Sequence, residues 1–356
     1  MRCFAFPLLL FALVAISPAH AQEMLRIGLS APLGGDFRIL GEQWAQGARA
    51  AAALREQPVE LIEADDACTV EGGAAAARRL VEARVSIVIG FLCTPAVEAA
   101  MPVFKEAGIP VITPVRTNSL TDQKDRTGWP VYRLGPRADA EREAVADILV
   151  PLWREEFFAI VDDGTIHGRE LAENLRARAE LAELKPVLVD TFRPQLDNQI
   201  GLVGRLRRAG ATHVFVGGDR SDTAIMARDA AGLDYAVTFA GGEALRAEDG
   251  PVPLSAGVLM VGLPEWRDIA TPDALAALEA ARVQPEGYAL QSFAAFEVAV
   301  SAAGEAANAE LPVTTALAQL TFATAIGEVR FDEKGDLAGN PYRLFRYDGE
   351  RFVEVP

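Results

Sequence analysis

Short runs rich in β-branched and aliphatic residues alternate along the chain with longer alanine-rich stretches. Such runs predict buried β-strands. They occur at Leu25–Leu29, Val59–Glu63, Ile87–Ile89, Val111–Thr113, Phe157–Val161, Val187–Thr191, His213–Val216, Ala236–Phe239 and Gly257–Val261. Strands that alternate with helices in this way are typical of an α/β fold with mostly parallel sheets.

The stretches between these runs carry apolar residues at helical spacing and therefore predict helices. They are Gly41–Leu54, Ala74–Ala83, Pro95–Lys105, Ala138–Leu152, Gly168–Leu181, Asp197–Ala209 and Asp222–Ala231. The last third of the chain adds predicted helices at Tyr288–Ala307 and Thr314–Leu320. It closes with two predicted strands, Glu328–Phe331 and Tyr342–Tyr347, which we expect to pair across a turn at residues 333–336.

The length of the chain predicts two lobes. Its 356 residues, half of them apolar, exceed one ordinary hydrophobic core. No linker rich in Gly, Pro or Ser separates the halves, so we expect ordinary extended segments to join them. Tyr132–Pro136 and Leu263–Pro264 are candidate hinges, because Gly- or Pro-bearing joints can absorb backbone rotation; plain connecting loops are the alternative.

The first 21 residues have the pattern of a cleaved secretory signal peptide. Arg2 supplies a positive start, Phe4–Ile16 is an apolar run, and Ala19-His20-Ala21 has the small-x-small form of a cleavage site. A membrane anchor is the alternative, but the apolar run is short for a bilayer core of about 30 Å. The sequence therefore predicts an exported, soluble protein.

Export changes what the cysteines and the charge imply. Without the signal peptide only Cys68 and Cys93 remain, and an oxidising compartment favours one disulfide between them over two free buried thiols. The formal net charge of −16 disfavours nucleic acid and anionic membranes as partners, and plain solubility of an exported protein is the simpler explanation of this charge.

In open α/β sheets ligands bind beyond the carboxyl ends of the strands, so the residues after each strand are the informative ones. Thr94 suits a helix N-cap before Pro95, where free N–H groups favour a carboxylate or similar anion. Thr117 and Arg116 follow the next strand in a polar loop, and a guanidinium can bind a carboxylate with two hydrogen bonds. A plain cap and a solvated arginine are the alternatives.

The second half offers one histidine and two acidic side chains at the equivalent places. His167 follows one strand in the loop that begins at Asp162, Asp219 follows another, and Glu243 comes after Gly241-Gly242. A carboxylate at Glu243 could pair with a ligand ammonium, since either charge buried alone would be costly. An amino acid needs both donors and an acceptor, and the two halves together supply them.

Catalytic and cofactor patterns are poorly supported. No Gly-x-Ser-x-Gly nucleophile elbow precedes a helix, and no His/Cys/Asp spacing typical of a metal site occurs. Gly34-Gly35 lacks the Gly-x-Gly-x-x-Gly form of a dinucleotide site. We therefore expect a protein that is not an enzyme and that uses no metal or cofactor.

At several of these places the chain resembles the leucine/isoleucine/valine-binding protein family, the periplasmic amino-acid-binding components of ABC importers. The matching strings are Ile27-Gly28, Ala31-Pro32-Leu33-x-Gly35, Gly47-Ala48, Asp65-Asp66-Ala67-Cys68, Val88-Ile89-Gly90-x-Leu92-Cys93, Ile112-Thr113-Pro114, Gly217-Gly218 and Phe331-Asp-Glu-Lys-Gly-Asp-Leu337. They span Leu25 to about Tyr347, almost the whole exported chain.

The resemblance implies a type I periplasmic binding fold, in which two α/β lobes are joined by three crossovers. Lobe 1 would hold residues 22–135 and 265–327, and lobe 2 residues 136–264 and 328–356, with 1–21 as the signal peptide. It also implies a Cys68–Cys93 bridge in lobe 1. The ligand carboxylate would be held by Thr94, Thr117 and the main chain at Val115, and the ligand ammonium by Glu243.

The departures from the family pattern fall where the ligand side chain would be read. His167 stands where a tyrosine is common, Asp219 near the place of another aromatic residue, and Arg116 where a small residue is usual. Arg116 and Asp219 would either select a polar or charged ligand or face water.

The resemblance further implies a monomer in the periplasm that delivers a small amino acid to an inner-membrane ABC permease with cytoplasmic ATPase subunits. A receptor of the same fold for amides, urea or aromatic acids is one alternative. A periplasmic sensor for a signalling partner is the other.

Overall fold

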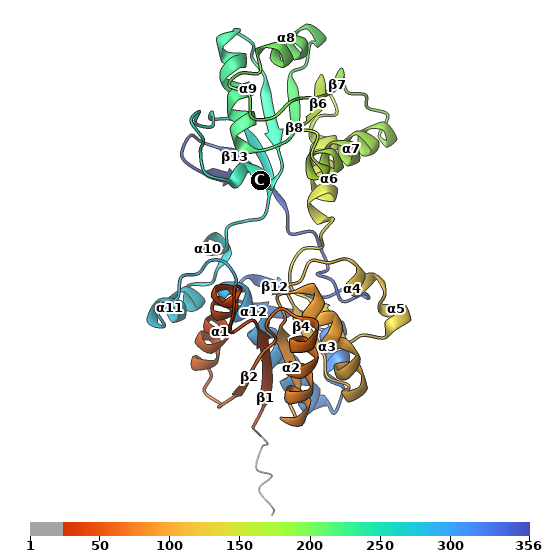
Figure 1. The fold of residues 1–356 in the computed structure, drawn as a ribbon, viewed down its shortest axis with the longest axis vertical. Helices are drawn as coiled ribbons and strands as arrows, with labels where there is room; N and C mark the ends of the chain where they lie inside the picture. The colour runs from red at the N-terminus through yellow and green to blue at the C-terminus, as the bar shows by residue number, and fades with distance from the viewer. Residues whose placement is uncertain (1–23) are drawn as a thin grey trace, which may run out of the picture.

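The computed structural model describes residues 24–356. Two separate sheets, each flanked by helices, form two lobes at opposite ends of the long axis (Figure 1). The expected two-lobed α/β fold is confirmed. The predicted signal peptide, residues 1–21, lies outside the described residues.

Lobe 1 contains a five-stranded, fully parallel sheet in the order β2-β1-β3-β4-β5. Its strands are β1 (Arg26–Ala31), β2 (Glu60–Asp65), β3 (Ile87–Gly90), β4 (Val111–Thr113) and β5 (Val131–Arg133). Its longer helices are α1 (Arg38–Ala53), α2 (Val70–Glu82), α3 (Thr94–Ala107), α11 (Pro272–Ala280), α12 (Ala289–Ala309) and α13 (Val313–Gln319). The short elements are α4 (Ser119–Asp122), α5 (Lys124–Thr127), α10 (Trp266–Ile269) and the hairpin β11 (Phe322–Thr324) to β12 (Gly327–Val329).

Each face of this sheet has its own core, because alternate side chains of a strand point to opposite faces. Ile87 and Ile89 pack against α1 and α12 on one face. Val88 between them packs against α2 and α3 on the other. Both cores are fully buried, which makes lobe 1 a rigid support for the loops at the ends of its strands.

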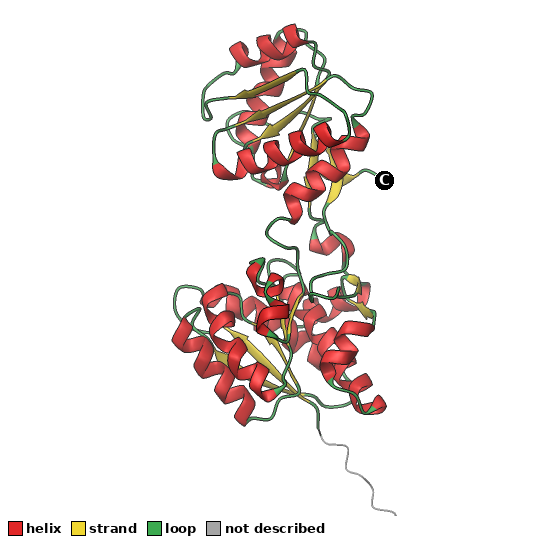
Figure 2. Cartoon of the chain, turned by 90° about the vertical axis from the view of Figure 1, so that its right-hand side faces the viewer, coloured by secondary structure: helices red, strands yellow, loops and turns green. Residues whose placement is uncertain are grey.

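Lobe 2 contains a seven-stranded mixed sheet in the order β14-β13-β10-β9-β8-β6-β7. Figure 2 shows helices on both sides of this sheet. Its strands are β6 (Phe158–Asp162), β7 (Leu188–Thr191), β8 (His213–Gly217), β9 (Thr238–Gly241), β10 (Leu259–Gly262), β13 (Arg343–Tyr347) and β14 (Phe352–Glu354). Its helices are α6 (Ala140–Leu152), α7 (Ile166–Leu181), α8 (Ile200–Ala209), α9 (Arg220–Gly232) and the 3-10 turn η1 (Glu243–Arg246). Helices α6 and α7 cover one face, and α8 and α9 cover the other.

Three crossovers join the lobes: residues 134–139 between β5 and α6, residues 263–265 between β10 and α10, and residues 338–342 before β13. Figure 1 shows these segments as the connections between the lobes. The predicted hinge at Leu263–Pro264 coincides with the second crossover. The other predicted hinge is partly wrong, since Tyr132 and Arg133 belong to strand β5 and only Leu134–Pro136 lie in the first crossover.

The predicted pairing of the two closing strands is also wrong. Residues 327–329 pair with the preceding strand β11 in lobe 1, whereas β13 pairs with β10 and β14 in lobe 2. Phe331 packs in the lobe 1 core, with its ring centroid 5.3 Å from that of Tyr132. The stretch 328–337 therefore packs with lobe 1, and the boundary expected at residue 327 falls too early in the chain.

Within residues 24–356 no helix is both long and apolar enough to cross a bilayer.

Candidate functional site

A cavity of about 350 Å³ lies on lobe 1 beside the crossovers. The loop after β4 contributes Val115, Arg116 and Thr117 to its lining, and the start of α3 contributes Thr94. Pro136 and Leu263 from two crossovers complete the wall together with Trp266, Tyr288 and Gln291. The lobe 1 residues predicted to hold a ligand carboxylate therefore line one cavity.

The start of α3 leaves donors available to a ligand. Cys93 is the N-cap residue and makes no side-chain cap hydrogen bond, since its sulfur is bonded to Cys68. The hydroxyl oxygens of Thr94 and Thr117 lie 2.6 Å apart. The positive end of the helix dipole and these two hydroxyls together make a suitable place for an anionic oxygen.

The backbone of the β4–α4 loop is fixed by buried hydrogen bonds. The Thr113 hydroxyl donates to the carbonyl of Phe91 at 2.8 Å and accepts from the Val115 N–H at 3.2 Å. Both Thr113 and Val115 are buried. The side chain of Thr113 thus ties the loop after β4 to the loop after β3, so that Thr94 and Thr117 meet.

Arg116 reaches from this loop toward lobe 2. Its Nη2 donates to the hydroxyl of Tyr342 at 2.9 Å, and that hydroxyl donates to Oε2 of Glu243 at 3.1 Å. Burial, and then the nearby Glu243 carboxylate, hold the pKa of Tyr342 well above its ordinary value. The phenol stays neutral and can donate, so Arg116, Tyr342 and Glu243 form a polar chain between the lobes.

Glu243 is held in turn by a second carboxylate, Glu141 on α6. The Glu243 N–H donates to Oε1 of Glu141 at 2.7 Å, and Nε2 of His167 lies 3.7 Å from Oε2. Glu141 is buried, which raises the pKa of its carboxyl. The lobe 2 side of the site is therefore rich in carboxylates, with the exposed His167 at its rim.

Asp219 is used differently from the other predicted residues. Its carboxylate caps α9 by accepting from the Asp222 N–H at 2.8 Å, and its side chain is exposed. Across residues 24–356 no hydrogen bond or ion pair joins Asp219 to Thr94, Arg116 or Glu243.

The sequence profile of the family described as periplasmic binding protein matches residues 24–351. The chain belongs to the periplasmic binding protein family.

Relatives of this periplasmic binding protein align with it over nearly the whole of both chains. An amino acid binding protein of Pseudomonas aeruginosa is 29% identical over 357 residues, which cover 95% of this chain and 94% of the relative. The Leu/Ile/Val-binding protein homolog 3 of Brucella melitensis is 26% identical over 351 residues, with the same coverage of both chains. These relatives are named as binding proteins, not as enzymes.

Solved structures share the fold. A protein described as a branched-chain amino acid ABC transporter from Rhodospirillum rubrum has a TM-score of 0.76 at 18% identity and covers 93% of this chain and 100% of its own. A substrate-binding protein of Desulfitobacterium hafniense in complex with Leu has a TM-score of 0.61 at 20% identity, with 94% and 100% covered. A solute binding protein of R. palustris in complex with benzoate has a TM-score of 0.54 at 17% identity, with 93% and 95% covered.

Two residues that contact Glu243 in this periplasmic binding protein, Glu141 and Tyr342, were not predicted from the sequence. Glu141 lies 102 residues before Glu243, and Tyr342 lies 99 residues after it. Neither residue directly follows a parallel strand, where ligand-binding residues of α/β sheets are expected. Glu141 lies in the first turn of α6, and a buried carboxylate at that place has no sequence signature of its own.

The disulfide of this periplasmic binding protein joins Cys68 to Cys93, with Cα atoms 5.2 Å apart, as the cysteine count favoured. It links the loop before α2 to the start of α3. The first turn of α3, which carries Thr94, is thereby anchored covalently to a neighbouring loop.

Proposed function

We propose that this protein binds a small amino acid between its two lobes. The ligand carboxylate would accept from the hydroxyls of Thr94 and Thr117 and from backbone N–H groups at Arg116, Thr117 and the start of α3. The Val115 N–H, the expected main-chain donor, already donates to the Thr113 hydroxyl. The ligand ammonium would donate to Glu243 on lobe 2. In this arrangement the negative end of the zwitterion faces the donors of lobe 1, and its positive end faces the carboxylate of lobe 2.

The observation that carries this proposal is the pairing of donors and an acceptor across the lobes. The Thr94 and Thr117 hydroxyls are 2.6 Å apart at the uncapped start of α3. Glu243 on the other lobe is joined to the same loop through Tyr342 and Arg116. A zwitterion satisfies both groups at once, whereas a ligand without an ammonium would leave the Glu243 carboxylate without a cation.

Binding would close the lobes. Contacts to both ends of a ligand form only when the lobes approach each other, so the ligand stabilises the closed state over the open one. In the periplasm the closed form would be recognised by an inner-membrane ABC permease, whose cytoplasmic ATPase subunits drive transport.

A ligand with a carboxylate and no ammonium is the second candidate. The Glu243 carboxylate already accepts from Tyr342, and aromatic side chains of Trp266 and Tyr288 line the cavity. Such a site also suits an aromatic acid, the ligand class of the benzoate-bound R. palustris protein.

Isothermal titration calorimetry of ligand-stripped, refolded protein separates the two candidates. The panel holds the common amino acids, their amides, benzoate and 4-hydroxybenzoate. We expect at least one amino acid to bind, and its amide to bind much more weakly because the carboxylate is lost. Binding of aromatic acids alone would favour the second candidate, and absence of binding by every compound would contradict both.

A further inference from the structure

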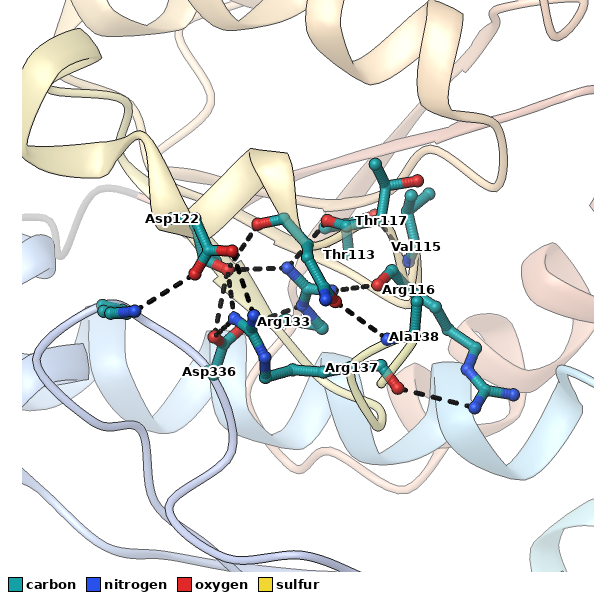
Figure 3. Close-up of polar contacts among 12 residues, drawn as sticks. Thr113, Val115, Arg116, Thr117, Asp122, Arg133, Arg137, Ala138 and Asp336 are labelled. Atoms are coloured by element: carbon teal, nitrogen blue, oxygen red, sulfur yellow. Dashed lines mark hydrogen bonds and ion pairs between the residues drawn. The ribbon is translucent and has the colours of Figure 1, made fainter. Parts of the chain in front are cut away.

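Arg133 is fully buried although it carries a charge. It is the last residue of β5, and its side chain has 0% relative exposure. A buried guanidinium is costly unless most of its donors are used. Figure 3 shows its side chain between the β4–α4 loop and Asp336.

Most of the hydrogen bonds that Arg133 donates go to the loop after β4, which carries the proposed binding site for the ligand carboxylate. Its Nη1 donates to the carbonyl of Arg116, and its Nη2 donates to the carbonyl of Thr117 at 2.9 Å and to the hydroxyl of Thr121 at 2.7 Å. Its Nε lies 2.8 Å from Oδ1 of Asp336. One side chain therefore holds two consecutive carbonyls of this loop.

Holding these carbonyls fixes the direction of the N–H groups. In a trans peptide the C=O and the N–H point in opposite directions. When the Arg116 carbonyl points at Arg133, the Thr117 N–H of the same peptide points away from it. Thr117 lines the cavity. Arg133 thereby sets which backbone donor a ligand carboxylate would meet.

The same network reaches two crossovers. Oδ2 of Asp336, two residues before the third crossover, accepts from Nη1 of Arg137 in the first crossover at 2.7 Å and from the Thr121 hydroxyl at 3.0 Å. The N–H of Ala138, also in the first crossover, donates to the Arg116 carbonyl at 2.9 Å. Figure 3 shows these contacts converging from the loop and the crossovers.

A purely stabilising ion pair would not need this geometry. A buried ion pair is often replaceable by apolar residues at little cost in stability. Such a replacement would lose the hydrogen bonds from Arg133 to two carbonyls of the loop after β4.

We propose that Arg133 is a positioning residue that orients the Arg116 and Thr117 peptides for ligand binding, and that Asp336 orients Arg133 and connects this loop to the first and third crossovers. The effect of this orientation on ligand binding rests on the proposed function. The contacts themselves can be tested without a ligand.

Hydrogen exchange of the ligand-free protein is the test. The main reporter is the Leu120 N–H, which donates to the Thr117 carbonyl. The second is the Ala138 N–H, which is shared between the Arg116 carbonyl and Oδ1 of Asn118. In the double variant Arg133→Met/Asp336→Asn no buried charge is left unpaired by the change, and the introduced asparagine can still accept from Arg137. We expect near wild-type thermal stability, together with about tenfold faster exchange at both reporters, a factor typical of one lost hydrogen bond.

Arg133→Lys provides a second variant if the double variant fails to fold. Lysine keeps a charge for Asp336 but lacks the planar fork that spans two carbonyls. We expect faster exchange at the same reporters. Arg205→Lys is the control, because Arg205 pairs through two nitrogens with an exposed carboxylate oxygen of Asp190 on lobe 2. In this variant the exchange of the Ala138 and Leu120 N–H groups should match the wild type.

Wild-type exchange at both reporters in a folded Arg133 variant would overturn the proposal. An amino acid that binds the wild-type protein should also bind the double variant at least about tenfold more weakly, at preserved thermal stability. Unchanged affinity would likewise overturn the positioning role. If no amino acid binds even the wild type, the proposed function fails while the exchange result still decides the role of Arg133.

Discussion

Glu243 on lobe 2 offers a carboxylate acceptor, and Thr117 on lobe 1 offers a hydroxyl donor. The hydrogen bond between Arg116 and Tyr342 connects the two lobes near these residues. The sequence pointed to Thr94, Thr117 and Glu243 because each follows a strand whose end lies at the ligand edge of a parallel sheet. Arg133 and Tyr342 gave no such signal. Side-chain direction across a lobe boundary depends on tertiary packing, which a linear pattern does not contain.

Replacing Glu243 by alanine tests the acceptor. We expect Glu243→Ala to weaken binding of an amino acid by about 2 kcal/mol, or roughly thirtyfold, because a charged hydrogen bond to the ammonium is lost. Calorimetry measures this change. The control is Glu180→Ala, at an exposed i,i+4 pair with Arg176, which should leave the dissociation constant unchanged. An unchanged constant for Glu243→Ala would remove this residue from the site.

At the scale of elements, the buried aliphatic strands were predictable, including the three-residue strand β4, whereas the three-residue strands β5, β11 and β14 were not predicted. Strand β5 consists only of Val131–Arg133. In the sequence its charged arginine, followed by Gly135 and Pro136, favours a connecting segment over a buried strand. The closing strands were paired wrongly because a turn pattern at 333–336 suggested a hairpin, whereas β12 pairs with the preceding strand and β13 joins the other sheet. Local patterns predict strands better than partners, since partners are chosen by distant segments.

The first turn of α9 carries a buried carboxylate with a pH signature. Asp222 is 1% exposed, and its Oδ1 accepts from the Gln195 N–H at 2.9 Å. Burial raises the pKa of the Asp222 carboxyl to about 6. A pKa raised on folding favours the protonated form in the folded state, so this stabilisation is present at low pH and is lost as the pH rises through about 6.

Asp222→Asn removes this titration. Relative to the wild type, the variant should gain about 2 kcal/mol in its free energy of unfolding between about pH 4 and about pH 7.5, because the wild type alone has to ionise the buried carboxyl. Urea unfolding at both pH values measures the difference. Asp268→Asn, at an exposed position on α10, is the control. A difference from the wild type that does not vary with pH would contradict the assignment.

At the scale of the whole molecule, two rigid sheets are joined by three short crossovers that can act as a hinge. A second cavity, of about 380 Å³, is lined by residues of all three crossovers, including Gly135, Leu263 and Gly339. Few side chains have to repack when such segments bend, so small backbone changes can move one lobe against the other. The two lobes were predictable from chain length and from the repeated strand–helix alternation. The family resemblance implied a third crossover, but its position at residues 338–342 was not predictable, because the sequence pattern predicts that the strands on either side of a turn at residues 333–336 pair with each other.

We expect a zwitterion to bridge the lobes, with its carboxylate at Thr94 and Thr117 and its ammonium at Glu243. The most direct measurement is a crystal structure of the protein with the amino acid that binds most tightly in the calorimetric panel. We expect the ligand to be enclosed between the lobes, with its carboxylate hydrogen-bonded to both threonine hydroxyls and its ammonium to Glu243. A ligand bound elsewhere, or one whose ammonium does not contact Glu243, would contradict it.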